Sequence, residues 1–151
     1  MNPLQDDPGA AREALCGLIS ADLDDDAVLD RRARGVWSAL CEPGDGDAGV
    51  LVAAVGAAEA LRLVIADDVH AVAVAAGAET GRAREALERW RPRVAPGPIA
   101  AAFDTARRAG VRLVVPGDAV WPTRVDDLGP HAPLCLWARG SLPARVGAAY
   151  W

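Results

Sequence analysis

Helix-breaking residues occur so often in this chain that only short helices fit between them. The breaks within residues 27–110 fall at residues 42–45, at Gly56, at Pro92 and at residues 96–98. Apolar residues recur at helical spacing in the segments between these breaks. Because a short helix cannot bury its apolar face alone, the pattern predicts a bundle of about five or six short helices packed on one another.

The individual segments follow from the same periodicity. A hairpin of two helices is expected around Gly56, since glycine permits the sharp turn at a helix end. A helix-hairpin-helix motif that grips DNA would carry a second glycine to expose backbone amides to a phosphate, so packing is the favoured role of this hairpin. Residues 67–77 fit either a helix or a strand. Three more helices are expected, after Ala27, from Thr80 to Pro92 and from Ile99 to Gly110.

The N-terminal residues look different from the rest. The first ten contain two prolines and a glycine and are expected to form a loose leader, followed by a short helix over residues 10–19. The aspartates of residues 22–26 indicate a solvated linker or a helix cap rather than a cation site. Residues 1–26 are therefore expected to be a flexible leader and linker.

Composition supports an α-rich fold. Hydrophobic residues make up 52% of the chain but aromatic residues only 5%, so the core must consist mainly of Ala, Val and Leu. Such side chains suit closely packed helices better than a sandwich of bulky strands.

A different pattern begins at residue 111. Residues 111–115 form an apolar run typical of a strand, and Pro116, Gly117 and Asp118 then turn the chain. Pro122 suits the first position of a short helix, in which Trp121, Val125 and Leu128 would share one face. Residues 134–137 predict a second strand. We therefore expect an α+β chain whose strands come last.

These last residues resemble a known family. The order RLVVPGD (residues 112–118), WP (121–122), RVDDL (124–128) and LCLWARG (134–140) is similar to the entry to the Rossmann-like domain of the DNA-processing protein DprA (Smf) family. The motif positions are Pro116, Gly117, Asp118, Trp121, Pro122, Leu128, Arg139 and Gly140. Residues 38–61, 87–93 and 100–114 resemble the helical N-terminal region of actinobacterial members, which is SAM-like or helix-hairpin-helix-like. The resemblance covers roughly residues 31–140.

The resemblance implies a non-enzymatic protein. It would bind single-stranded DNA and help to load the RecA recombinase during natural transformation and recombination. In the family a DNA-binding motif of the Gly-Ser-Arg type follows the residues that correspond to Gly140. Residues 145–151 read RVGAAYW instead, so the chain is expected to be truncated before that motif.

The charge distribution supplies a candidate DNA contact. The net charge is −5, which repels nucleic acid overall, but residues 78–112, here called the basic segment, hold eight arginines and four acidic residues. Arginines on solvated helix faces are the alternative explanation. The candidate DNA-binding residues are Arg82, Arg84, Arg89, Arg91, Arg93, Arg107 and Arg108.

No catalytic or metal-binding constellation is predicted. Cys16, Cys41 and Cys135 have no paired spacing, and His70 has no second ligand nearby. The carboxylates of Asp118, Asp126 and Asp127 lack an accompanying nucleophile, so capping and solvation are favoured. Neither a membrane span nor a signal peptide is indicated, so a cytoplasmic location is expected, with no cofactor.

The expected organisation is therefore a leader and linker over residues 1–26, a helical domain over 27–110 and the incomplete start of a Rossmann-like domain over 111–151. The predicted function is that of a DprA-like fragment with single-stranded DNA and RecA as partners. The alternative is a helical protein-interaction module without DNA binding. Its exposed strands would recruit a partner or a second copy by edge pairing, which allows a homodimer.

Overall fold

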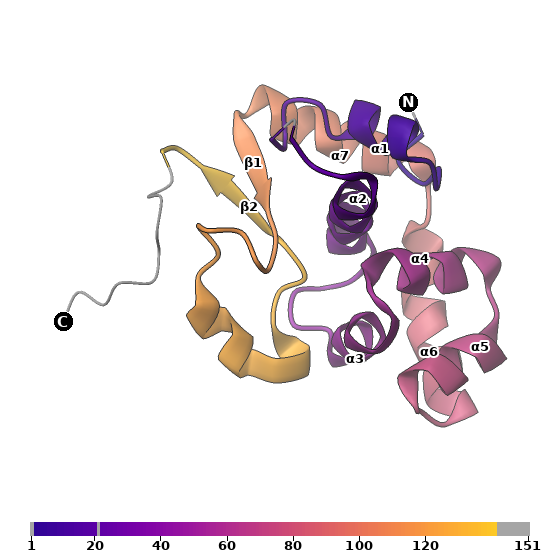
Figure 1. Cartoon of the computed structure of the whole chain (residues 1–151). Coiled ribbons are helices and arrows are strands. Elements are labelled where there is room, and N and C mark those ends of the chain that lie inside the picture. The colour runs from indigo at the N-terminus through magenta and orange to yellow at the C-terminus, as the bar shows by residue number, and fades with distance from the viewer. Residues whose placement is uncertain (1, 21, 142–151) are drawn as a thin grey trace.

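The computed structural model describes residues 2–20 and 22–141, which are mostly helical with one small antiparallel sheet (Figure 1). This confirms the predicted fold class, mostly α within α+β. In chain order the elements are α1 (Pro8–Ala14), α2 (Asp25–Leu40), α3 (Gly46–Val55), α4 (Ala57–Ala66), α5 (Val69–Ala76), α6 (Thr80–Trp90), η1 (Arg91–Arg93), α7 (Pro96–Arg108), β1 (Val111–Val114), η2 (Thr123–His131) and β2 (Leu136–Arg139).

Helix α2 forms the centre of the molecule, and α1, α4 and α7 pack around it (Figure 1). Its Trp37 is fully buried, donates a hydrogen bond from Nε1 to the carbonyl oxygen of Ala57 at 3.1 Å, and meets Trp90 edge to face at 5.0 Å. Gly35 on the same helix lies against Phe103 and Leu113, where an added Cβ would be 3.1 Å from the Phe103 ring. A glycine here lets α7 and β1 approach α2 closely.

The predicted helical hairpin is present. Gly56 ends α3 and precedes α4 with φ 84°, and the two helices are bent by 113° at this point. The segment that fitted either a helix or a strand is helix α5, because Asp68 caps its first turn and Gly77 ends it in the left-handed region. Helix α6 ends just before Pro92, as predicted, and buries Ala83, Ala86, Leu87 and Trp90.

The N-terminal residues are not a loose leader in the described structure. Asp7 caps α1, Pro8 occupies its first turn, and Ala14, Leu15 and Leu18 are fully buried against the core. The predicted helix over residues 10–19 therefore begins earlier and ends earlier, because the capping carboxylate and the proline both favour a helix start. Of the aspartates in residues 22–26, Asp24 caps α2 by accepting a hydrogen bond from the Ala27 amide at 2.8 Å.

The boundary before α7 also differs from the prediction. The break expected at residues 96–98 is the first turn of the helix, which begins at Pro96. Prolines are tolerated there because the first amides of a helix have no intrahelical acceptor. Ile99 and Phe103 are buried, as the periodicity predicted.

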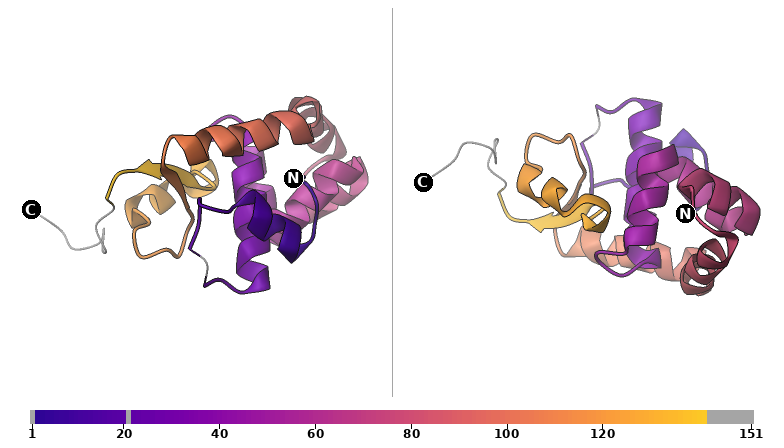
Figure 2. Two further views of the ribbon diagram at one scale, coloured as in Figure 1. Left: turned by 90° about the horizontal axis from the view of Figure 1, so that it is seen from above. Right: turned by 90° about the horizontal axis from the view of Figure 1, so that it is seen from below.

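Strands β1 and β2 pair antiparallel, with Val111 opposite Arg139 and Leu113 opposite Trp137. Each strand lies within one or two residues of its predicted range. The β1–β2 hairpin lies on one side of the helical bundle, and α5 and α6 lie on the opposite side (Figure 1 and Figure 2). Phe103 of α7 contacts Trp137 with ring centroids 5.9 Å apart, so the sheet is joined to the bundle by aromatic packing.

The segment between the strands is a 3₁₀ helix, η2, rather than the amphipathic helix predicted from residue 121. Trp121 is buried, with 2% exposure, but Leu128 is 56% exposed. Trp121 precedes η2, which begins at Thr123, and a 3₁₀ helix has about three residues per turn, so the α-helical spacing of Trp121, Val125 and Leu128 does not bring them onto one face. Pro122 is the residue that caps η2 rather than its first helical residue.

Candidate functional site

The turn after β1 is the centre of the motif found in the sequence. Gly117 has φ 95°, a conformation that glycine adopts without strain. The Asp118 carboxylate accepts a hydrogen bond from the Val115 amide at 2.9 Å, which closes the turn on itself.

The same carboxylate binds Arg31 of α2 through both of its oxygens, and one of the two nitrogen–oxygen distances is 2.8 Å. The side chains of Arg31 and Asp118 are only 14% and 21% exposed. Burial by itself would raise the pKa of Asp118, but the hydrogen bonds from Arg31 and Val115 and the positive charge of Arg31 outweigh it and lower the pKa below 3.8. Asp118 therefore stays ionised and fixes the turn to the helical bundle.

The structure also locates Trp121, Arg139 and Gly140 of the motif. The indole Nε1 of Trp121 donates a hydrogen bond to Asp126 at 3.0 Å. Asp126 is one of the three aspartates considered above as candidates for acid–base chemistry, and its carboxylate here accepts a structural hydrogen bond. Arg139 is the last residue of β2 and is exposed, and Gly140 follows it with φ 93°. Residues 145–151, where the family motif was expected to be missing, lie outside the described residues.

Most arginines of the basic segment form ion pairs. Five of the seven candidates do so: Arg82 with Asp47, Arg89 with Asp45 and Asp47, Arg91 with Asp67, Arg93 with Glu42, and Arg107 with Asp104. The carboxylates at the start of α3 thus hold two arginines of α6 together. A phosphate would have to compete with these carboxylates for the same guanidinium groups.

The seven candidates do not form one continuous group. Arg107 turns toward α1, where it donates hydrogen bonds to the carbonyl oxygens of Cys16 at 2.6 Å and Ala14 at 2.9 Å. Arg84 and Arg108 are exposed, and within the described part of the chain neither has an ion-pair or hydrogen-bond partner. Among the seven candidates, Arg84 and Arg108 are therefore the two whose guanidinium groups are available to an external anion.

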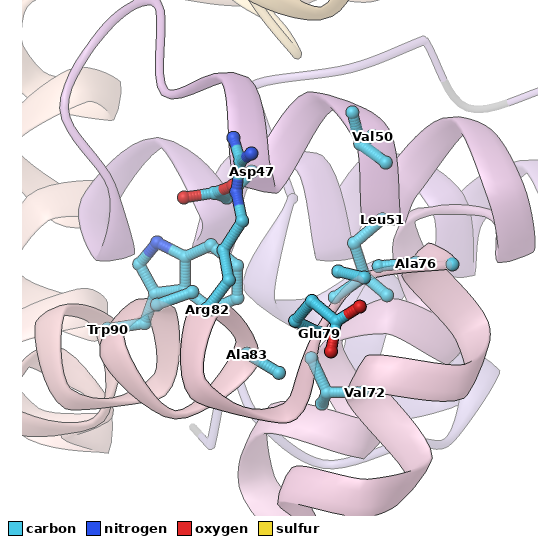
Figure 3. Close-up of a pocket in the computed structure, with 12 residues that line it drawn as sticks. Asp47, Val50, Leu51, Val72, Ala76, Glu79, Arg82, Ala83 and Trp90 are labelled. Atoms are coloured by element: carbon cyan, nitrogen blue, oxygen red, sulfur yellow. The ribbon is translucent and has the colours of Figure 1, made fainter.

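A pocket of about 400 Å³ lies between α3, α5 and α6 (Figure 3). Its walls are mainly apolar, from Leu51, Val72 and Trp90 among others, and the Asp47–Arg82 ion pair lies at one end. The Trp90 indole donates a hydrogen bond to Asp45 at 2.9 Å, so the ring has a fixed orientation. Asp47 and Glu79 are the carboxylates among the described residues that line this pocket, and Asp47 is held in its ion pair with Arg82.

Cys41 and Cys135 line one pocket, and the other cysteine and the two histidines are not among its lining residues. Burial raises the pKa of the Cys41 thiol to about 12 and of the Cys135 thiol to about 11, whereas Cys16 is exposed. His131 contacts the carbonyl oxygen of Gly44 through Nδ1 at 2.8 Å, and His70 is exposed. Over residues 2–20 and 22–141, no three of His, Cys, Asp or Glu are arranged to hold a metal ion.

Two residues with structural roles, Gly49 and Arg32, were not predicted from the sequence. Gly49 on α3 lies so close to the backbone of η2 that an added Cβ would be 1.8 Å from the carbonyl oxygen of Pro130. Arg32 is 1% exposed and is held by Asp6 at 2.9 Å. Neither position has a local sequence signal, because both depend on segments that are distant in the chain.

Comparisons with protein-family models, with curated proteins and with solved structures found no match to this chain. None of the described helices is by itself long and apolar enough to span a membrane. Helices α3 and α4 meet the length and composition criteria only as a bent pair.

Proposed function

We propose that this chain is a DprA-like DNA-processing protein that binds single-stranded DNA and assists RecA without catalysing a reaction. The supporting observation is the Arg31–Asp118 ion pair, which joins the turn after β1 to the helical region. The two residues lie at the start and near the end of the segment that resembles the family. The residues that resemble the family thus form one packed unit, as expected if the helical region and the motif serve a common role.

The DNA contact is assigned to the basic segment, and Arg84 and Arg108 are its main cations. Among the described residues their guanidinium groups have no carboxylate partner that a phosphate would have to displace, whereas Arg89, Arg91 and Arg93 do. Each phosphate contact on a single strand contributes about 0.7 to the slope of log affinity against log salt. Losing Arg84 and Arg108 should therefore reduce this slope by about 1.4.

The experiment is fluorescence anisotropy of a labelled oligothymidylate of about 30 nucleotides, titrated with the full chain at several salt concentrations. The variant Arg84→Ala/Arg108→Ala should lose most of the affinity. The matched variant Arg91→Ala/Arg93→Ala removes two arginines that already have carboxylate partners and should lose less. Binding that is unchanged when all four arginines and Arg89 are replaced by Ala would reject the basic segment as the contact.

The alternative is a helical protein-interaction module without DNA binding. The observation that favours it is the pairing of five candidate arginines with carboxylates, which neutralises much of the basic segment. Retention of RecA by the immobilised chain distinguishes partner binding from DNA binding. If RecA is retained after nuclease treatment while the oligonucleotide shows no anisotropy change, the protein-interaction module is the better description.

A further inference from the structure

The two edges of the small sheet are unequal. The amide of Leu113 in β1 donates a hydrogen bond to the carbonyl oxygen of Leu18 at 2.9 Å, and the amide of Val115 donates to Asp118. Both amides point away from β2. The outer edge of β1 is therefore occupied by other parts of the same chain.

Within the described part of the chain, the outer edge of β2 is open. Leu113 lies opposite Trp137, and its backbone groups point away from the partner strand. Because backbone groups alternate in an antiparallel ladder, Trp137 and Arg139 direct their N–H and C=O groups away from β1. No hydrogen bond to these groups is formed by any other part of residues 2–20 and 22–141. Figure 1 shows β2 on the outer side of the hairpin.

We propose that this edge pairs with the same edge of a second copy of the chain, antiparallel and centred on Ala138. The backbone groups of Trp137 would then bond those of Arg139 in the second copy, and the two-fold symmetry repeats this exchange. The product is a continuous four-stranded sheet in the order β1, β2, β2, β1. This pairing removes an edge that is otherwise open to unspecific association.

The side chains of β2 fit this register. Ala138 faces its own copy at the narrow, non-hydrogen-bonded position, where Cα atoms are about 4.5 Å apart and a small residue fits. Trp137 lies opposite Arg139 of the second copy, so an aromatic ring meets a guanidinium group rather than a like charge. A pairing centred on Arg139 would instead place two guanidinium groups directly opposite each other. The complementary pairing of Trp137 with Arg139 therefore selects a second copy as the occupant.

The first test measures mass by sedimentation equilibrium from about 10 µM to about 500 µM. The chain should approach twice its monomer mass of 15.7 kDa as concentration rises. Arg139→Pro removes an outward amide but no amide of the β1–β2 ladder, so it should raise the dimer dissociation constant at least about tenfold. Arg139→Ala keeps that amide and should have a smaller effect, since it loses only the guanidinium–indole contact.

The second test fixes the register without depending on a proline. In a Cys16→Ser background, Ala138→Cys should form an intermolecular disulfide on mild oxidation, because the two sites face each other at disulfide distance. Ala101→Cys on the exposed face of α7 is the matched control and should not cross-link. A chain that stays monomeric at the highest concentration overturns the proposal. A dimer that is unaffected by Arg139→Pro and not cross-linked through position 138 overturns it as well.

Discussion

The Arg31 guanidinium on α2 and the Asp118 carboxylate in the turn after β1 form a two-point ion pair across 87 positions of sequence. Asp118 also accepts the amide of Val115. One carboxylate therefore determines both the local shape of the turn and its attachment to the helical bundle. The motif that suggested a functional family thus has a clear structural task.

Replacing Asp118 should destabilise the fold strongly. Asp118→Ala leaves the Arg31 guanidinium, which is 14% exposed, without its counter-ion and leaves the Val115 amide without an acceptor. We expect a loss of about 2–4 kcal/mol in the free energy of unfolding, measured by urea denaturation. Asp127→Asn is the control, because Asp127 is exposed, and it should change stability by less than about 0.5 kcal/mol. Equal effects of the two variants would contradict the assigned role.

The stability of the chain should fall in acid. Hydrogen bonds from arginines lower the pKa of Asp6, and at Asp47 and Asp118 arginine contacts outweigh the opposing effect of burial, so all three folded-state pKa values lie below 3.8. The unfolded chain therefore binds more protons in this range, and stability is complete above about pH 5 and is lost as pH falls through the lowered pKa values. Urea midpoints measured at decreasing pH check this. Asp118→Asn should show a shallower loss, and an unchanged slope would count against Asp118 as a contributor.

The helices were predictable because their signals are local. Gly56 and Pro92 end helices through their own backbone properties, and Ala83, Leu87 and Trp90 reveal their shared face by spacing alone. The segment around Leu128 was predicted wrongly because the same spacing was taken to be α-helical, whereas a 3₁₀ helix turns the residues to other faces.

The electrostatics of the candidate site were not predictable in the same way. The sequence showed a basic segment, but its neutralisation depends on residues such as Asp47, which comes from another helix. Periodicity reports which face of a helix is polar, and it does not report which carboxylate lies opposite. The Arg31–Asp118 pair has the same origin, since only the folded chain brings its two residues together.

Asp6 is expected to be the counter-ion on which the buried Arg32 depends. Arg32 is 1% exposed, and Asp6 bridges it to Arg62. Asp6→Ala should cost about 2–4 kcal/mol of unfolding free energy, because it leaves a buried charge unpaired. Adding Arg32→Met to that variant should recover much of the loss, since an apolar side chain needs no partner there. Arg12→Ala breaks the exposed pair with Asp25 and should cost less than about 0.5 kcal/mol.

Only one thiol should react in the folded chain. Cys16 is exposed, whereas burial raises the pKa of Cys41 to about 12 and of Cys135 to about 11, so their thiolate forms are scarce near pH 8. Titration with a chromogenic disulfide reagent should give one thiol per chain under native conditions and all three in about 6 M guanidinium. Cys16→Ser should abolish the native reaction. Rapid reaction of that variant would show that a second cysteine is accessible.

Two glycines on helices should respond in opposite directions to the same substitution. Gly49→Ala on α3 would place a Cβ 1.8 Å from the carbonyl oxygen of Pro130, and since that atom is backbone, η2 must move. We expect a loss of about 2–4 kcal/mol in unfolding free energy. Gly81→Ala on α6 meets open space and should stabilise the chain by about 0.5–1 kcal/mol, because alanine restricts the unfolded chain and favours the helix. Thermal denaturation of both variants measures the difference. A neutral Gly49→Ala would mean that η2 does not pack against α3 as described, so this pair of variants tests the placement of the segment that joins the two strands.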